Sequence, residues 1–590
     1  MCVGVDDFPQ IPHLVQTLGP RITPAEMPFL GILEDKKLPH VPGTVILGDE
    51  TIRSDDLVGA LKHGTGRNSH VILVPQPSND PNDPLNWPQW KKVASFGITC
   101  WGTLLYGAVS IAMLNPALYA MSVQLEVSIT AMVLTAGYQT LVTGVSGPIF
   151  AALARKYGKR PMFLFASLVC LVGNIVGSAV PTYQGVLASR ILQGFSIAPY
   201  ESLIFDMLSD MFFLHERGVY TALVNFCLVG VSNITAVVSG PIVTNLGWRW
   251  LYYLITIFGV AQLILQFLFV PETTYIRASI YDIDSNVSEN LDELVELETK
   301  EAMRDEKYAD RAIHDEGRRI VPTISRESQE PPPLKKTFVQ NLAILNGTFS
   351  NENLLQAFIA PFLVAVNLSV LWVLIVNSMF IVLYVVIALV IAQEFGPPPY
   401  LLSASSIGLL SLGPFVGGVV GAIFMALASD PFIKWCAGRN NGIFEPEYRL
   451  IPCIFGLCTG AGLLGWGFMV ADYVSPVATA TMHGLVVFGA LITAVATSNY
   501  AIDAYRSLTA EIFIASMAVK NIIIFGFTYF VNDWTAQTGV RHAFVVWSVV
   551  GFALLATTPF MYVLGKKYRS YWARNNLLEK WSIVSRGGSG

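Results

Sequence analysis

The stretch RKYGKRP, residues 155–161, separates two long apolar segments of the chain. It places four cations around a single glycine, Gly158. The cations are Arg155, Lys156, Lys159 and Arg160. Each flanking segment is long enough to cross a hydrocarbon core of about 30 Å as a helix. Because lysine and arginine collect in short loops on the cytoplasmic side of membrane proteins, the stretch predicts a cytoplasmic turn between two spans.

The composition of the whole chain is that of a multi-span membrane protein. Of its 590 residues, 53% are hydrophobic and 13% are charged. Soluble globular proteins carry about 25% charged residues, which argues against a soluble protein. The N-terminus lacks the basic and then apolar layout of a cleavable signal, so we expect the first span to direct insertion. The seven cysteines show no metal-site spacing, and we expect no disulfide, no metal, no cofactor and no nucleic-acid partner.

Apolar runs predict an all-α membrane protein with twelve transmembrane helices, arranged as six plus six. The first six spans are expected at 93–117, 128–153, 161–181, 185–207, 218–241 and 248–270. The second six are expected at 366–393, 405–428, 449–471, 477–501, 509–532 and 542–565. This pattern predicts an N-terminal tail at 1–92, a six-helix bundle at 93–270, a linker at 271–365, a second bundle at 366–565 and a C-terminal tail at 566–590.

The distribution of lysine and arginine among the loops predicts the orientation of the chain. With both termini in the cytoplasm, the predicted outer loops hold only Arg249 and Arg541. The inner segments then hold the basic clusters, including residues 155–160. We expect a monomer with cytoplasmic termini in the plasma membrane, with the vacuolar membrane as the alternative.

The polar segments outside the bundles are predicted to be irregular or solvated. Residues 1–90 are rich in proline, glycine and polar side chains, which is typical of disorder. Acids and bases at i, i+4 spacing in 272–336 predict a solvated helix that ends in a proline-rich stretch. A tether between the two bundles is the simplest interpretation of this interval, and a regulatory contact is the alternative.

Several motifs at the predicted span ends resemble signatures of the major facilitator superfamily. RKYGKRP is similar to its loop signature of an acid, a base, any residue, glycine and two bases. SRILQGFSIAPYESL, in the fourth span, is similar to its arginine–x–x–glutamine–glycine signature through Arg190, Gln193 and Gly194. VVSGPIVTN, in the fifth span, has the Gly240–Pro241 core of the antiporter signature without the paired glycines that usually follow.

Other fragments resemble a fungal group within that superfamily. VPQPSNDPNDPLNWPQWKK, before the first span, is similar to fungal drug:proton antiporters and their relatives that carry cations or polyamines. DMFFLHERG, GWRWLYYL, VPETTY and EPEYRL point to the same group. The resemblance touches almost the whole chain from about residue 70. It implies the major facilitator fold, with two six-helix bundles around a midplane site, and it does not specify a substrate.

The predicted fourth span carries two ionisable side chains, Arg190 and Glu201, and a buried charge is a functional candidate because it is costly in a membrane. Their separation of eleven residues returns them to nearly the same helix face, about 16 Å apart. A carboxylate whose surroundings change during alternating access can take up a proton on one side and release it on the other. Glu201 is the candidate for that role, and Arg190 and Gln193 are further candidates for proton coupling or substrate binding. The alternative is that both charges only hold neighbouring helices together.

Two later spans add further candidates. Lys520 and Asn521 lie about halfway through the eleventh span, where relatives often have a base followed by asparagine. A lysine this deep either pairs with an acid of the other half or is neutral. His483, in the tenth span, can titrate near neutral pH, although a lone histidine in a helix more often serves packing.

Uncharged polar and aromatic side chains at helical spacing predict a cavity lining. The candidates are Gln139, Asn225, Asn377, Tyr384 and His483. Such residues also allow helices to pack closely, which is the alternative interpretation.

The loop after the second span departs from the superfamily pattern. Relatives usually have an acid three residues before the loop glycine, and this acid latches against the N-terminus of the eleventh span. In this chain that position is occupied by Arg155. Glu511, in the first turn of that span, can supply the missing carboxylate, and Asp430 occupies the equivalent position in the second half. We therefore expect a swapped Arg155–Glu511 pair. The alternative is that Arg155 only adds positive charge on the inside. The predicted gating residues are Arg155, Gly158, Lys159, Arg160, Gly240, Pro241, Asp430 and Glu511.

These features predict a proton-coupled secondary transporter of small organic solutes in the lipid bilayer. Export of cations or drug-like metabolites by alternating access is the first expectation, and uptake of a cationic nutrient or polyamine by proton symport is the second. A membrane sensor built on a transporter scaffold is less favoured, because only about 25 residues follow the last span. A membrane enzyme is disfavoured, because the sequence has no phosphate-binding loop, zinc motif or nucleophile elbow.

Overall fold

The computed structural model describes residues 31–33, 38, 41–46, 77–78, 80–275, 335–350, 353–440, 443–505 and 508–575. The helix predicted within 272–336 lies almost entirely outside these residues. The backbone of Asp430 is described, but its side chain is not. In the described residues the chain is helical apart from two short strands, β1 (Val45–Ile46) and β2 (Ile443–Phe444), which pair in antiparallel fashion.

Six helical segments form the first half of the bundle. The first is composite and contains α2 (Gln89–Gly102), η4 (Thr103–Val109), α3 (Ser110–Ala112), η5 (Asn115–Ala117) and α4 (Leu118–Gln124). It is followed by α5 (Ile129–Tyr157), α6 (Lys159–Ala179) and α7 (Tyr183–Met211). The last two are α8 (Leu214–Asn225) with η6 (Phe226–Gly230) and α9 (Val231–Leu246), and then α10 (Arg249–Phe269).

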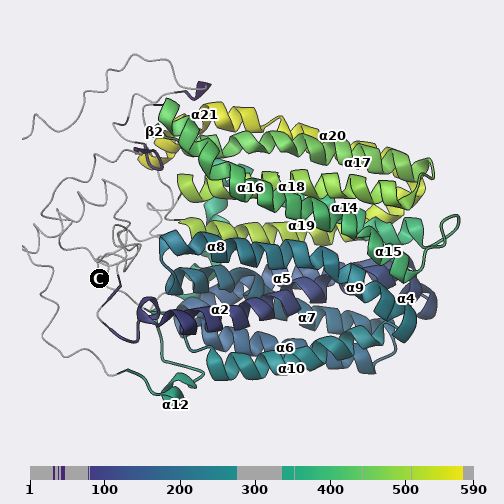
Figure 1. Ribbon diagram of the computed structural model, residues 1–590, viewed down its shortest axis with the longest axis horizontal. Coiled ribbons are helices and arrows are strands. Elements are labelled where there is room, and N and C mark those ends of the chain that lie inside the picture. The colour runs from purple at the N-terminus through teal and green to yellow at the C-terminus, as the bar shows by residue number, and fades with distance from the viewer. Residues whose placement is uncertain are drawn as a thin grey trace, which may run out of the picture.

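Six further segments form the second half. They are α14 (Leu368–Phe395), α15 (Ala404–Leu410) with α16 (Leu412–Arg439), η9 (Pro446–Phe455) with α17 (Gly456–Ala471), α18 (Pro476–Ala504), α19 (Thr509–Thr538), and α20 (Val540–Leu555) with α21 (Thr558–Arg574). Short helices outside these spans are η3 (Pro84–Asn86), α12 (Phe338–Asn341), α13 (Leu354–Leu363) and η8 (Val364–Val366). The helices of the two halves lie side by side, the first half in purple to teal and the second in green to yellow (Figure 1).

The predicted all-α architecture of two six-helix bundles is confirmed. Ten of the helices in the described residues are long and apolar enough to cross a membrane by length and composition. α5 and α7 are not among the ten, although each has 29 residues. Both helices carry many buried polar side chains and pack against each other, which explains their lower hydropathy.

The lipid-facing surface is visible on the outer helices. On α6, the exposed side chains Phe165, Leu168, Val172 and Ile175 recur every three to four residues. This spacing puts them on one helix face, as expected for a helix at the edge of a membrane bundle. Exposed apolar residues in this arrangement are the lipid contact of a multi-pass membrane protein.

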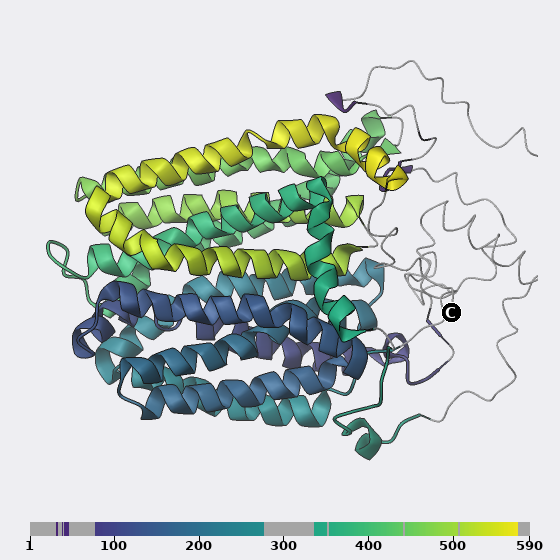
Figure 2. The same cartoon turned by 180° about the vertical axis from the view of Figure 1, so that it is seen from behind.

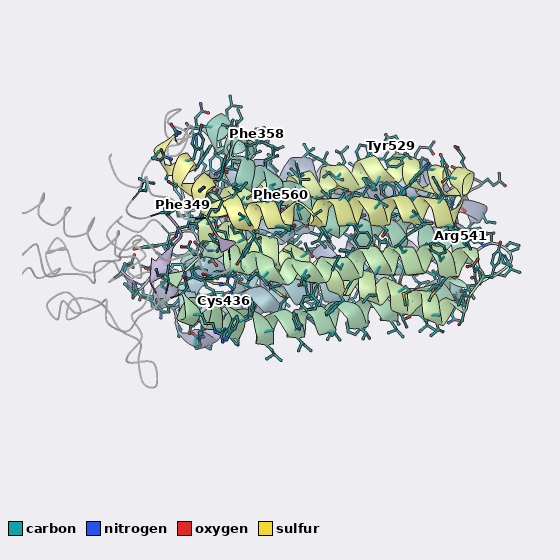
Figure 3. All side chains as sticks on the ribbon, turned by 90° about the horizontal axis from the view of Figure 1, so that it is seen from above. Phe349, Phe358, Cys436, Tyr529, Arg541 and Phe560 are labelled. Carbon is teal, nitrogen blue, oxygen red and sulfur yellow. The ribbon has the colours of Figure 1, made fainter. Side chains whose placement is uncertain are left out.

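The two ends of the bundle differ in charge. We call the end that holds Gly158, Arg439 and Lys566 the basic end. Figure 3 shows Phe349 and Cys436 toward this end and Arg541 toward the opposite end.

A helix not expected from the sequence, α13, crosses the basic end and contacts both α5 and α19 (Figure 2). It therefore joins the two halves just before the second bundle begins.

Small residues allow the two halves to approach closely. A Cβ atom on Gly240 would lie 2.6 Å from the carbonyl oxygen of Ala404, and one on Gly408 would lie 2.3 Å from that of Ala236. These glycines bring α9 and α15 together. Gly240 thus serves as a contact between halves, and Pro241 follows it inside α9.

Parts of the N-terminal tail make defined contacts, although the sequence predicts that residues 1–90 are largely disordered. β1 pairs with β2, and the Thr44 hydroxyl donates a hydrogen bond to Glu445 at 2.8 Å. Ile32 is buried against side chains of α16, β2 and η9. Residues 31–33 and 41–46 are therefore docked on the second half, because they contribute both a strand partner and an apolar anchor.

Candidate functional site

An ion pair between Glu201 and Lys520 joins the two halves inside the bundle. Lys520 Nζ donates to Glu201 Oε1, and Asn521 Nδ2 lies 3.4 Å from Glu201 Oε2. The side chains of Glu201 and Lys520 are only 13% and 19% exposed. Glu201 comes from α7 and the other two residues from α19. Of the two alternatives for Lys520, the structure shows the pairing with an acid of the other half.

The pair lies well inside the membrane-spanning region. Glu201 is ten residues from the end of α7 and Lys520 is eleven residues from the start of α19, both counted from the basic end. At a rise of 1.5 Å per residue, both residues lie about 15 Å from that end. The two helices therefore present opposite charges at the same depth.

Aromatic side chains lie on the two helices of the ion pair and on α14. The Tyr384 hydroxyl, on α14, is close enough to interact electrostatically with the Glu201 carboxylate. Nearer the basic end, the rings of Phe205 and Phe513 stack with centroids 5.7 Å apart. This stack is a further contact between α7 and α19, on the basic side of the pair.

The two halves also touch near the opposite end. The hydroxyl groups of Tyr138 and Tyr529 lie 2.9 Å apart, and Thr130 donates to Asp533 at 2.6 Å. Both contacts join α5 to α19, which are adjacent along much of their length. Movement of one half against the other must therefore break polar contacts at several depths.

Arg190 belongs to a separate buried cluster within the first half. Its Nη1 donates to the Ser110 carbonyl at 2.6 Å, to Gln139 Oε1 at 2.9 Å and to Gln193 Oε1 at 3.2 Å. The Arg190 side chain is almost fully buried. Arg190 and Glu201 were predicted on one helix face, but the structure gives each its own polar partners. The Arg190 contacts match the alternative in which the charge holds neighbouring helices together.

Asn174 extends this cluster and was not predicted from the sequence. Gln193 Nε2 donates to Asn174 Oδ1 at 2.8 Å, and Asn174 Nδ2 donates to the Cys170 carbonyl at 2.9 Å. The cluster thereby connects α3, α5, α6 and α7. A single asparagine in the apolar run of the third span was the signal available in the sequence.

The other predicted lining residues lie in different surroundings. Asn377 Nδ2 donates to the Ala494 carbonyl at 2.9 Å and to Ser498 Oγ at 2.8 Å, which fits the packing alternative. Asn225 is exposed and donates to the Thr221 carbonyl of its own helix at 3.0 Å. His483 is buried, and neither ring nitrogen has a hydrogen-bond partner in the described part of the chain. A cavity-lining role for these residues stays a prediction.

The predicted Arg155–Glu511 pair is present at the basic end. Arg155 Nη2 lies 2.6 Å from Glu511 Oε1 and joins the end of α5 to the first turn of α19. Glu511 also lies near the N-terminus of α19, where a carboxylate is favoured by the helix dipole. The contact has the geometry of a latch between the halves, and its role in gating stays a prediction.

Gly158 and Glu272 shape the turn between α5 and α6. Gly158 has a φ of 94°, and a Cβ atom there would lie 2.3 Å from Glu272 Oε2. The Glu272 carboxylate accepts hydrogen bonds from the backbone N–H groups of Lys159 and Arg160, each at 3.0 Å. Glycine is required both by its backbone conformation and by this close approach. Glu272, in the VPETTY fragment, was not predicted as a site residue.

Two of the remaining loop cations, Lys159 and Arg160, bind within the first half. Lys159 Nζ lies 2.7 Å from Asp210 Oδ2 near the end of α7. The Arg160 guanidinium donates to the Val270 carbonyl and, at 2.7 Å, to the Phe267 carbonyl. Arg160 thus satisfies carbonyl groups at the C-terminus of α10, which otherwise lack helical partners.

A second buried ion cluster lies at the basic end of the other half. Arg569 donates to Glu447 at 3.0 and 2.8 Å and to Glu445 at 2.9 Å. Lys566 Nζ lies 2.8 Å from the second oxygen of Glu445. The sequence shows this cluster only through the EPEYRL fragment, because its cations come from more than 100 residues later in the chain.

These features define a multi-pass helical membrane protein whose two bundles are joined by ion pairs inside and at the edge of the membrane. A sequence profile described as Major Facilitator Superfamily matches residues 100–511. The chain belongs to the Major Facilitator Superfamily.

The similar proteins are fungal. An uncharacterised MFS-type transporter of Schizosaccharomyces pombe is 25% identical over 591 residues, which cover 94% of this chain and 98% of that protein. Protein HOL1 of Saccharomyces cerevisiae is 26% identical over 550 residues, 86% and 91% of the two chains. The MFS transporter cpaT of Aspergillus oryzae is 25% identical and covers 83% of this chain and 90% of its own.

A solved structure shares the fold. A D-xylose-proton symporter has a TM-score of 0.50 at 14% identity and covers 79% of this chain and 96% of its own. At that identity the likeness concerns the fold alone. The family match and the similar fungal proteins together identify the chain as a membrane transporter of the fungal type and not an enzyme.

Proposed function

We propose that the chain is a proton-coupled secondary transporter that exports small organic cations by alternating access. The observation that carries this proposal is the Glu201–Lys520 ion pair. Its two charges belong to opposite halves of the bundle and lie at the same depth in the membrane region. Arg155–Glu511 is the second contact in the proposal and acts as the latch at the basic end.

Opening the basic end must pull α7 away from α19 and separate the pair. A carboxylate left alone in the membrane interior is costly, so it needs a new counter-charge or a proton. A proton or an organic cation on Glu201 meets that need. Because both compete for one carboxylate, the exit of one favours the entry of the other, which is antiport.

Two side chains near the pair, Tyr384 and Asn521, are suited to binding an organic cation. The faces of aromatic rings attract cations, and Tyr384 lies near Glu201. Asn521 offers an amide beside the carboxylate. The substrate is thus expected to carry a positive charge on an organic body.

Uptake by proton symport is the second candidate, and a specific observation favours it. The Gly240–Pro241 pair in α9 is followed by Ile242 and Val243 rather than the paired glycines of the antiporter signature. A symporter can use the same Glu201 carboxylate if proton and substrate bind together. The direction of transport under a known gradient separates the two candidates.

We further propose that the basic end faces the cytoplasm and that the protein works as a monomer in the plasma membrane. The loop cations Arg155, Lys159, Arg160, Arg439 and Arg449 lie at this end in the described residues. Positively charged loops stay on the cytoplasmic side during insertion, which supports this orientation.

The test is transport into sealed vesicles with an imposed pH gradient. Purified full-length protein is reconstituted, and the movement of labelled spermidine and of tetraphenylphosphonium is followed with a pH-sensitive dye inside. We expect one of these cations to move against the proton flux, and Glu201→Gln to abolish the dependence on the gradient.

Asp206→Asn is the matched control, because Asp206 lies five residues further along α7 and forms no ion pair among the described residues. It should keep gradient-driven transport. Unchanged proton-coupled transport by Glu201→Gln would overturn the proposal. Movement of the cation together with protons would favour symport, and no movement of any solute would favour the sensor interpretation.

A further inference from the structure

A short segment at the basic end exposes an unusual amount of apolar surface. The segment, residues 335–345, contains α12 and precedes the membrane-crossing helix α14 by about two dozen residues. Four of its five large apolar side chains, Phe338, Val339, Ile344 and Leu345, are 58%, 75%, 49% and 63% exposed. In a chain that spans a membrane, such side chains at the edge of the bundle require a partner.

The segment is held in place on the first half. The Lys336 backbone N–H donates to Asn82 Oδ1 at 2.9 Å, and the Leu342 carbonyl accepts from Arg160 at 3.2 Å. Thr337 forms a capping box with Gln340 at the start of α12. Just beyond the segment, the Phe349 N–H donates to the Lys156 carbonyl at 2.9 Å. The exposed apolar side chains are therefore presented by a fixed backbone.

Three lysines accompany the apolar side chains. Lys335 and Lys336 come directly before α12 and are exposed. The ammonium group of Lys335 lies close enough to that of Lys91, at the start of α2, for the two to repel. None of the three lysines forms an ion pair within the described part of the chain, and Lys91 Nζ lies 3.7 Å from the ring centroid of Trp87. Like charges gathered this way favour an anion between them.

The carboxylate nearest in the hydrogen-bond network already has other partners. Asp80 accepts from the Tyr275 hydroxyl at 3.0 Å and from the Asn82 N–H at 2.7 Å. It is connected to the segment through Asn82, which also binds the Lys336 backbone. The lysine ammonium groups are thus left to an anion from outside the described residues.

The position of the segment matches the edge of a membrane. Figure 1 shows α12 beside the basic end of α10, at the outer side of the bundle. Arg160 binds both the carbonyls at the end of α10 and that of Leu342, so the segment lies at the depth where the spans end. Phe269, the last residue of α10, is itself half exposed. The segment and the end of α10 therefore both expose apolar side chains at this end of the bundle.

We propose that residues 335–345, together with Lys91, bind the headgroups of anionic phospholipids in the leaflet at the basic end. The lysines contact the phosphate and carboxylate groups, and the apolar side chains insert between the headgroups and the acyl chains. Aromatic and lysine residues at the membrane interface act in this combination. The proposal uses the orientation given above but does not depend on proton coupling.

The first test measures lipid binding by the purified full-length protein in detergent. Phosphatidylserine and phosphatidylcholine with the same acyl chains are titrated separately, and bound lipid is counted by native mass spectrometry. Each lysine at an anionic surface contributes roughly fivefold to affinity. We expect the triple variant Lys91→Gln, Lys335→Gln, Lys336→Gln to lose about 100-fold of its phosphatidylserine affinity, with phosphatidylcholine binding unchanged.

The matched control removes the same charge from the other half. Lys434, Arg439 and Lys567 are exposed at the basic end of the second bundle. Their triple replacement by glutamine should leave phosphatidylserine binding within about twofold of wild type, since they lie outside the segment. Equal losses in both triple variants, or no loss in the first, would overturn the proposal.

The second test locates the apolar side chains and does not depend on the charge variants. Val339→Cys is labelled with a nitrobenzoxadiazole fluorophore after Cys2→Ser and Cys458→Ser, and the protein is placed in vesicles of phosphatidylcholine with 30% phosphatidylserine. Lipids with a nitroxide near the headgroup should quench label 339 but not a label at Lys434→Cys. Equal accessibility of both labels to an aqueous quencher, or protection of label 339 only in a dimer, would overturn the proposal.

Discussion

Arg155 Nη2 and Glu511 Oε1 lie 2.6 Å apart, so the two halves are tied at the basic end by a pair with reversed charges. In the superfamily pattern the acid stands before the loop glycine, and here that position holds the base. The Glu511 carboxylate stands in the first turn of α19. The polarity of the latch can therefore be tested by exchange.

We expect Arg155→Glu to impair transport, because it places two carboxylates together at the N-terminus of α19. Adding Glu511→Arg should restore activity by recreating the pair with the charges exchanged. The Arg155 side chain is 32% exposed, so solvent screens the pair and the coupling energy should be roughly 0.5–1 kcal/mol. A double-mutant cycle on transport rates measures it.

Lys434→Glu is a useful control for the loss of positive charge, because Lys434 is exposed at the basic end and lies on α16 rather than on α5 or α19. If the double variant is no more active than Arg155→Glu alone, Arg155 contributes only inside charge. Equal impairment by Lys434→Glu would lead to the same conclusion.

Gly240 provides a second prediction, for the contact between α9 and α15. A Cβ atom at this position would lie 2.6 Å from the Ala404 carbonyl oxygen, and backbone atoms cannot move aside easily. We expect Gly240→Val to hold these helices apart and to slow transport at least tenfold, while the protein still folds within each half. Transport rates and cross-linking of cysteines placed on α9 and α15 measure the effect.

Gly97→Ala supplies the comparison, since a Cβ atom at Gly97 meets nothing within 4 Å. Its transport rate should match the wild type. Normal cross-linking and transport in Gly240→Val would show that the α9–α15 contact tolerates a wider spacing.

The buried cluster around Arg569 yields a prediction about stability. Arg569 is almost fully buried and binds both Glu447 and Glu445, which are also buried. Removing it leaves two carboxylates without their main counter-charge, so Arg569→Ala should destabilise the protein by about 3–5 kcal/mol. The apparent unfolding temperature of the purified protein reports the change.

Arg574→Ala, on the same helix but exposed, should change the unfolding temperature by less than a degree or two if the effect comes from burial. Similar shifts in the two variants would mean that the cluster adds little to stability. In that case the hydrogen bond from Thr44 to Glu445 would also contribute less to docking of the tail than the pairing of β1 with β2.

Hydropathy and motif order were sufficient to predict the long helices of the two bundles and their grouping. The predicted spans at 161–181 and 477–501 overlap α6 and α18 closely, because long apolar runs have few alternatives to a transmembrane helix. α13 was missed because it is short and lies across the bundle end, which its hydropathy alone does not reveal. The docking of residues 41–46 was missed because it depends on pairing with β2, about 400 residues away.

The candidate site was predictable in its members and less so in its pairings. Glu201 and Lys520 stood out because each is a charge within an apolar run, but their contact joins helices 319 residues apart in sequence. Arg155 and Glu511 could be paired in advance through the departure from the superfamily pattern. Asn174 and Glu272 carried only a weak signal, because a lone asparagine within a span or a glutamate after one is common.

The last prediction separates the structural from the functional contribution of the ion pair inside the membrane. Lys520→Met leaves Glu201 without its counter-charge, so it should destabilise the protein by about 3 kcal/mol. Glu201→Gln combined with Lys520→Met removes both charges and should recover most of that loss, because no lone charge stays buried. Apparent unfolding temperatures of the two single variants, the double variant and Asp206→Asn give the coupling energy. We expect the double variant to be stable but unable to couple transport to protons. A double variant as unstable as Lys520→Met would mean that the two side chains do not compensate each other's charge.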